Sequence, residues 1–215
     1  MPTQLPLFPL KTVLFPGALL PLHIFEPRYR QMLADVAAGD RRFGLIPPGT
    51  TEELPPPGAI GCEALLRAVW PLADGRSNVV VGGERRFAFQ GPAISAAPYH
   101  RGLVDWIEDE PDVQVPTEDE VAALRALAQR YALALNKLND QAIDHEFSAA
   151  ASELTFQAAA LLEWDFESRQ SLLETRSATV RVTRLLHALP GLVAEAERRA
   201  AVHEAARGNG AGAYA

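Results

Sequence analysis

The N-terminal segment restricts the fold of this chain more than any other part of the sequence. Residues 6–29 are densely apolar, yet prolines interrupt them at positions 6, 9, 16, 21 and 27. Proline fixes φ and lacks a backbone N–H, so neither a long helix nor a central strand can run through these residues. The segment therefore predicts a short strand, a tight turn at Pro16-Gly17, an extended stretch and a helix that begins near Glu26.

The remainder of the first half has the pattern of a strand-rich domain. Short β-prone runs between turn residues predict strands at 4–10, 42–47, 60–70, 78–83, 85–90 and 99–107. Asp74-Gly75 is typical of a hairpin turn because glycine tolerates positive φ. Gly82-Gly83 predicts a bulge or a close approach of two backbones. With one helix at about residues 26–38, these many short strands favour a small, partly closed barrel.

The second half changes to helical periodicity after the acidic residues 108–112, which are interpreted as a solvated linker. Thr117 and Glu120 have the spacing of a capping box, and apolar residues then recur every three or four positions up to Leu138. Further helices are predicted at about 147–163, 167–175, 178–189 and 192–206, with Pro190-Gly191 separating the last two. The expected organisation is a strand-rich domain over 1–112, a helical domain over 113–207 and a disordered tail over 208–215.

Charge and cysteine content exclude several classes of protein. A net charge of −7 argues against nucleic-acid binding, which normally needs a basic face. The single cysteine, Cys62, excludes a disulfide framework and a multi-cysteine zinc site, and its strand-like surroundings predict a buried thiol. Neither a secretion signal nor an apolar run of membrane-spanning length is visible, so we expect a cytoplasmic protein with no membrane partner.

A search for catalytic motifs gives no candidate. Neither Lys11 nor Lys137 follows a glycine, so a phosphate-binding loop is missing. No serine lies in a G-x-S-x-G motif, and no pair of histidines has the spacing of a zinc-protease helix. We therefore expect no catalytic residue, no metal and no cofactor. A hydrolase whose nucleophile follows none of these patterns is the remaining enzymatic alternative.

The apolar N-terminal side chains are the best candidates for a functional surface. Either all of them belong to the core, or some line an exposed groove that binds extended peptides. The apolar candidates are Phe15, Leu20, Phe25 and Tyr29, and Arg28 and Arg86 are the candidate polar anchors. Edge strands of a small barrel would add main-chain hydrogen bonds to such a ligand.

Several short motifs carry a family resemblance. They are Pro6-Leu-Phe-Pro-Leu, Val13-Leu-Phe-Pro-Gly, Pro21-Leu-His-Ile-Phe-Glu, Val81-Gly-Gly-Glu-Arg-Arg-Phe and Arg169-Gln-Ser-Leu-Leu-Glu. In this order they resemble the N-terminal domain of the Lon protease family, over about residues 4–190. The resemblance implies an α+β fold, in which a PUA-like pseudo-β-barrel is followed by a C-terminal α-helical bundle. It also implies a domain that recognises substrates and helps to assemble a hexamer.

The function expected from these observations is that of a stand-alone, non-catalytic substrate-recognition domain. The chain ends at Ala215 without an ATPase or a peptidase module. Its expected partners are unfolded or peptide segments of client proteins, together with a protease or chaperone, and its expected state is a monomer or weak homodimer. The alternative is a binder of small molecules or nucleotide derivatives, with a cleft between barrel and bundle that holds several of Arg28, Arg85, Arg86 and Arg101.

Overall fold

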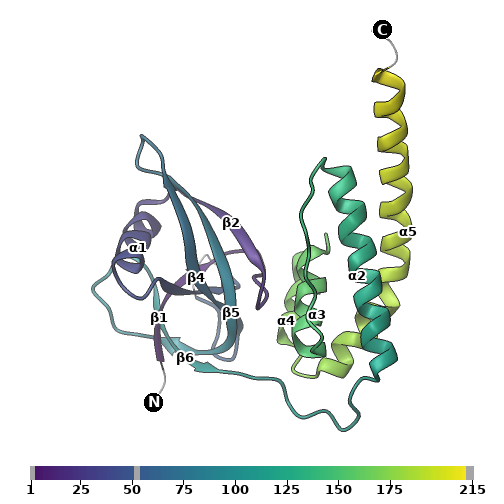
Figure 1. The fold of residues 1–215 in the computed structure, drawn as a ribbon. Coiled ribbons are helices and arrows are strands. Elements are labelled where there is room, and N and C mark those ends of the chain that lie inside the picture. Colours follow the sequence, from purple (N-terminus) through teal and green to yellow (C-terminus); the bar gives the residue numbers. More distant parts are fainter. Residues whose placement is uncertain (1–2, 51–53, 212–215) are drawn as a thin grey trace. The chain divides into compact units, whose positions relative to one another are not determined.

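The computed structural model describes residues 3–50 and 54–211, with side chains up to residue 207. Contacts between Cα atoms divide the chain into two compact units (Figure 1). The strand unit comprises residues 1–110 and 163–176, and the helical unit comprises 111–162 and 177–215. Strands and helices are both abundant, so the predicted α+β class is confirmed.

The strand unit contains a mixed sheet that closes on itself. Its elements are β1 (Thr3–Pro9), β2 (Leu19–Ile24), α1 (Pro27–Ala38), β3 (Arg42–Ile46), β4 (Ile60–Pro71), β5 (Ser77–Pro92), β6 (Arg101–Trp106) and α4 (Phe166–Glu174). The strand order is β2-β5-β4-β3-β1-β6, and β5 also pairs with β6. Five strands therefore form a closed ring, while β2 pairs with the N-terminal half of β5 outside it. β1 and β3 run parallel, and the other pairs are antiparallel.

Strand β5 is one element of 16 residues, so the prediction of two separate strands here was wrong. Gly83 explains the continuity, since a Cβ at this position would lie 2.1 Å from the carbonyl oxygen of Phe15. The missing side chain lets the turn before β2 approach β5 without interrupting its pairing. The predicted hairpin is confirmed at Gly75, which has φ +81° and donates its N–H to Leu72 O at 3.0 Å.

The proline-broken N-terminus folds as a strand, a turn, an edge strand and a helix. Gly17 has φ +76°, and the following residue, Ala18, donates its N–H to Phe15 O at 3.1 Å. β2 accommodates Pro21 because its only strand partner in the described sheet is β5. Pro27 opens α1 directly after its N-cap residue, Glu26, where proline costs the helix no hydrogen bond.

Two apolar clusters form the core of the strand unit. The larger joins α1 to the sheet and contains Phe8, Leu14, Ile24, Tyr29, Met32, Leu33, Val36, Phe43, Leu45, Cys62, Ala64, Leu66, Val79, Val81 and Tyr99. The smaller lies within the ring and contains Leu5, Leu7, Ile46, Phe87, Phe89 and Val104. The sequence interval 163–176, expected in the helical domain, packs with the strands instead. In α4, Leu172 and Leu173 are buried, and Gln170 donates to Ile60 O at 2.9 Å.

The helical unit contains α2 (Glu118–Leu138), α3 (Ala151–Leu161) and α5 (Ala178–Ala211). The predicted capping box at α2 is present, because Thr117 and Glu120 each accept a backbone hydrogen bond from the other. None of the helices in the described part of the chain combines the length and apolar character that crossing a membrane requires.

Helix α5 runs through Pro190, so the prediction of two helices separated at this residue was wrong. Proline removes one backbone hydrogen bond and crowds the preceding turn. The buried face of α5 nevertheless continues on both sides through Leu185, Leu189, Val193 and Ala196, while Pro190 itself is exposed. The free energy gained by packing this apolar face outweighs the cost of Pro190 to the helix. The helix also includes residues 208–211 of the expected tail, and residues 212–215 lie outside the described part.

Candidate functional site

A groove of about 480 Å³ opens in the strand unit between the end of β1, the strand β2 and the start of α1. Eight of its lining residues are apolar: Phe8, Pro9, Leu10, Pro21, Leu22, Phe25, Tyr29 and Pro48. The polar lining residues are Lys11, His23, Glu26 and Arg28. The proline-broken segment thus supplies almost the whole wall of this groove.

The floor of the groove rests on the core. Phe8 and Tyr29 are both buried, and their ring centroids lie 4.3 Å apart in a tilted arrangement. Tyr29 occupies the first turn of α1, whose start is fixed by Pro27. Because both rings are held by packing in the core, the small parts of them that line the groove form a rigid apolar floor.

Phe25 forms the exposed rim of the groove. Its side chain is 58% exposed, although a phenylalanine of a folded domain is usually buried. It stacks on the imidazole of His23, with 6.1 Å between ring centroids, and His23 Nδ1 lies 2.7 Å from Asn78 Oδ1. An aromatic ring held at the edge of an apolar groove suits contact with another apolar group.

Charged groups of both signs flank the apolar floor. Arg28 Nε donates to Glu26 Oε2 at 2.9 Å, and the Arg28 guanidinium lies 4.7 Å from the centre of the Tyr29 ring. Lys11 Nζ lies 3.6 Å from Glu167 Oε1 in a largely exposed pair. These groups can bond to the polar parts of a ligand while the floor takes its apolar parts.

The strand β2 offers a partly blocked edge beside the groove. Gly83 donates its N–H to Ala18 O, and antiparallel pairing alternates between residues that bond to the partner strand and residues that bond away from it. Leu20, Leu22 and Ile24 therefore bond to β5, while the backbones of residues 19, 21 and 23 face away. Because residue 21 is proline, this edge offers three carbonyl acceptors but only two N–H donors.

The structure brings together three of the six residues predicted to bind peptides. Phe25, Arg28 and Tyr29 line the groove. Leu20 is half-buried against the larger core cluster. Phe15 is buried, with the Arg169 guanidinium 5.1 Å from its ring centre.

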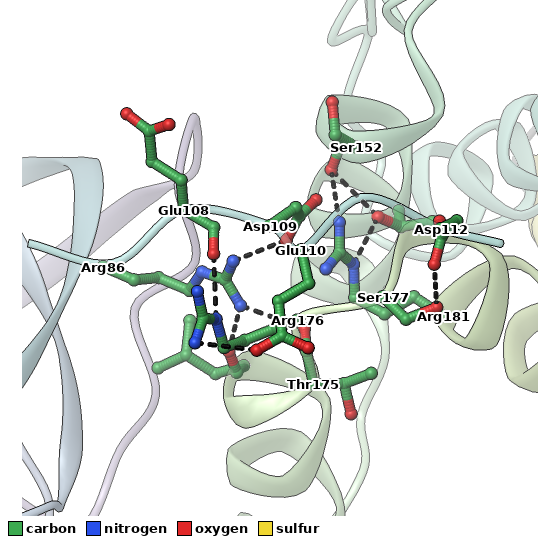
Figure 2. Close-up of polar contacts among 12 residues, drawn as sticks. Arg86, Glu108, Asp109, Glu110, Asp112, Ser152, Thr175, Arg176, Ser177 and Arg181 are labelled. Carbon is green, nitrogen blue, oxygen red and sulfur yellow. Dashed lines mark hydrogen bonds and ion pairs between the residues drawn. The ribbon is translucent and has the colours of Figure 1, made fainter. Parts of the chain in front are cut away.

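The remaining candidate, Arg86, is a buried structural residue. Its Nη1 donates to the carbonyl oxygens of Leu173 and Thr175, both at 2.9 Å, and its Nη2 lies 2.5 Å from Asp109 Oδ1 (Figure 2). The two carbonyls belong to the C-terminal end of α4, where helix carbonyls lack partners of their own. Arg86 therefore joins β5 to α4 and to the segment after β6.

The acidic segment 108–112 has specific partners, so it is more than the solvated linker that was expected. Besides the Asp109 bond, Arg176 donates to Glu108 O at 3.0 Å and pairs with Glu110 at 2.9 Å (Figure 2). The Glu110 N–H in turn donates to Arg176 O at 2.9 Å. Ion pairs and backbone hydrogen bonds together hold residues 108–110, where the first chain segment of the strand unit ends.

Three of the four arginines named for the alternative hypothesis, Arg28, Arg85 and Arg86, occupy separate places in the strand unit. Arg85 pairs with the buried Glu63 at 3.1 Å and lies 3.4 Å from the centre of the Trp106 ring. Arg86 is engaged as described above, and Arg28 lies at the groove. Each guanidinium already has protein partners, so these three do not converge on one polar pocket within this unit.

The cysteine is buried as predicted. Burial raises the pKa of the Cys62 thiol far above its ordinary value, so the thiol stays protonated. Among residues 3–50 and 54–211, no three histidine, cysteine or acidic side chains lie together in a way that could hold a metal ion.

Several residues that line the groove were not predicted from the sequence. Phe8, Leu10, Leu22, His23 and Pro48 were not named as binding candidates. His23 lies between two apolar residues of β2, and side chains alternate between the two faces of a strand. This pattern could have predicted that His23 faces away from the core. No local sequence pattern predicts Pro48 as a groove residue, because only the tertiary fold brings the loop after β3 to the groove.

A family model and curated relatives match this chain. The model described as the ATP-dependent protease La (LON) substrate-binding domain matches residues 4–190. A Lon protease of Cytophaga hutchinsonii is 24% identical over 214 residues, which cover 94% of this chain and 26% of that protein. Lon protease 2 of Myxococcus xanthus is 28% identical over 206 residues, which cover 88% of this chain and 24% of that protein. The chain spans about a quarter of the length of these relatives.

Solved structures give the same result for the fold. A Lon N-terminal domain protein from Xanthomonas campestris matches with a TM-score of 0.65 and 29% identity, over 87% of this chain and 99% of that one. The N-terminal domain of a Lon protease from the Mycobacterium avium complex matches with a TM-score of 0.61 and 20% identity, over 86% and 97% of the two chains.

Proposed function

The chain belongs to the Lon substrate-binding domain family, and on that basis we propose that it binds protein substrates in the groove between β1, β2 and α1. The observation that carries this proposal is the exposed Phe25 above a rigid apolar floor. The ligands are unfolded or peptide segments of client proteins, because an extended chain can lay successive side chains along such a groove and pair with the neighbouring edge of β2.

The β2 edge suits short extended segments. A peptide beside β2 would receive hydrogen bonds from the N–H groups of Leu19 and His23 and donate to the free carbonyls. Pro21 interrupts this ladder, which limits the length over which any strand, including a second copy of β2, can pair. Affinity then depends on the apolar groove more than on main-chain pairing.

We further propose that the chain binds without making or breaking covalent bonds. The sequence has no phosphate-binding loop, no nucleophile elbow and no zinc-protease motif, which supports this proposal. The closed ring of strands supports the expected pseudo-barrel of PUA-like type, and the packing of α2, α3 and α5 supports the expected bundle. We propose the cytoplasm as its compartment.

Replacement of Phe25 tests the groove directly. Phe25→Ala removes the exposed ring, and we expect the affinity for a permanently unfolded probe to fall about tenfold. The probe is reduced, carboxymethylated α-lactalbumin, and binding is followed by fluorescence anisotropy of a dye on the probe. Because Phe25 is mostly exposed, the variant should fold normally.

Ile94→Ala is the matched control, because Ile94 is an exposed apolar residue of the strand unit outside the groove. It should bind the probe as the native chain does. Equal affinities of the native chain and Phe25→Ala would contradict the proposed site. A native chain that does not bind the probe at all would contradict the proposed function.

A further inference from the structure

Two ion pairs connect α2 to α5 in the helical unit at regular intervals. Arg130 bonds to both carboxylate oxygens of Glu197 at 2.8 and 2.9 Å, and Lys137 Nζ lies 3.2 Å from Glu204 Oε2. Each pair joins residues 67 positions apart, so α2 and α5 run in the same direction at this level. The pairs are seven residues apart along each helix, which is about 10 Å of helix axis.

A groove of about 250 Å³ lies between the two ion pairs. Its floor is formed by Ala134 and Ala200, which are buried, with the exposed Ala201 beside them. Leu133 lines the side of the groove and is 61% exposed. One face of the helical unit thus presents both a hole lined by small residues and an exposed leucine of the kind that fills such holes in coiled coils.

From this face we infer a self-association site: two copies of the chain pair through α2 and α5, and Leu133 of each copy enters the alanine-lined groove of the other. A two-fold contact needs a surface that is complementary to itself. Leu133 and the hole meet that condition, because both lie at the same level of the same face.

The charges select one arrangement of the two copies. On this face both cations, Arg130 and Lys137, belong to α2, and both anions, Glu197 and Glu204, belong to α5. A two-fold axis parallel to the helices places α2 of one copy over α5 of the other, so cations meet anions. An axis perpendicular to the helices places α2 on α2, which sets cations against cations and disfavours that alternative.

Sedimentation velocity over a range of concentrations tests the association. We expect the native chain to shift from monomer to dimer, and Leu133→Glu to raise the dissociation constant at least about tenfold. Val202→Glu is the control, since Val202 is also exposed on α5 but points well away from Glu197 and Ala201 by helical rotation. Circular dichroism verifies that both variants keep their helices.

Cysteine cross-linking tests the arrangement. Cys62 is buried, so thiols introduced by Leu133→Cys and Ala201→Cys are the accessible ones. A mixture of the two variants should form disulfide-linked dimers faster than either variant alone, because residue 133 faces residue 201 of the other copy. A native chain that stays monomeric, or a Leu133→Glu variant that dimerises as the native chain does, would overturn the site. Faster linking of Leu133→Cys to itself would overturn the proposed orientation.

Discussion

Arg86 is the residue on which the strand unit depends most clearly. A buried guanidinium is costly unless its donors are satisfied, and here two helix-end carbonyls and the Asp109 carboxylate satisfy them. These partners lie 23 to 89 positions away in the sequence. One side chain therefore fixes α4 and the chain after β6 at the same time.

We expect Arg86→Ala to lower the free energy of unfolding of the strand unit by about 3 kcal/mol, because it removes the hydrogen bonds that the buried guanidinium donates to two helix-end carbonyls and to the half-buried Asp109 carboxylate. Urea unfolding followed by tryptophan fluorescence measures this, since Trp70, Trp106 and Trp164 all belong to the strand unit. Arg76→Ala is the control, because Arg76 is exposed and bonds only locally to Asp74. A loss no larger than that of the control would contradict the structural role.

Gly83 gives a second prediction at this scale. Gly83→Ala should destabilise the strand unit by about 2 kcal/mol, because the new methyl group meets the backbone of Phe15, which cannot move aside. At the neighbouring Gly82 a Cβ would approach the flexible, half-exposed side chain of Arg67 and not a backbone atom, so Gly82→Ala should cost clearly less. The same urea titration compares the two, and equal losses would show that backbone crowding is not the cause.

The sequence predicted some of these residues and not others, for a physical reason. The glycine pair was correctly predicted to allow a close approach, since only a missing side chain permits one. Arg86 was predicted as a polar anchor for a peptide, yet it is buried. Its partners are set by tertiary packing, which local sequence does not report.

At the scale of elements, local signals predicted the boundaries of α1 and α2 within one position. The Thr117 capping box and the Glu26-Pro27 step each fixed the first residue of a helix within one position. The interior of α5 was predicted wrongly, because Pro190 signals a break by local preference while the apolar face around it continues. Only half of the predicted binding residues line the groove, because local sequence again does not determine the tertiary structure. Proline spacing located the segment, but which of its side chains turn outward depends on the register with β5.

The start of α5 gives a prediction on acid stability. Asp112 accepts hydrogen bonds from the Ser177 hydroxyl and from the Thr179 N–H and hydroxyl (Figure 2 shows Asp112 and Ser177). These bonds, that of Ser177 above all, hold the pKa of the Asp112 carboxyl below its ordinary value of 3.8. A carboxyl with a lowered pKa in the folded state stabilises the fold fully above its ordinary value, and this contribution is lost as the pH falls through the lowered pKa.

Asp112→Asn should therefore be less stable than the native chain at neutral pH, and the difference should shrink as the pH falls below about 4. Urea unfolding followed by far-ultraviolet circular dichroism at stepwise lower pH measures both proteins. Asp144→Asn, at an exposed position of the same unit, is the control. If the difference between Asp112→Asn and the native chain stayed constant through the acid range, charge at Asp112 would not be its source.

For the whole molecule, the division into two units differs from the order of the sequence. The strand unit receives α4 from an interval that lies between two segments of the helical unit. A fragment of residues 1–112 lacks the bonds of Arg86 to α4 and the bond of Gln170 to Ile60. We expect this fragment to lose the cooperative fluorescence transition of its tryptophans, whereas a chain shortened only to residue 207 should keep it. Cooperative unfolding of the 1–112 fragment would show that α4 is dispensable.

The late position of α4 also concerns the living cell, where a ribosome releases the chain from its N-terminus. The six strands of the described residues end at Trp106, yet Arg86 cannot donate to the Thr175 carbonyl until residue 175 has been synthesised. About 70 residues are synthesised in this interval, which takes several seconds at ordinary translation rates. During that time the nascent sheet lacks the hydrogen bonds that Arg86 and Ile60 make with α4, so the strand unit can complete its fold only after residues 163–176 have been synthesised.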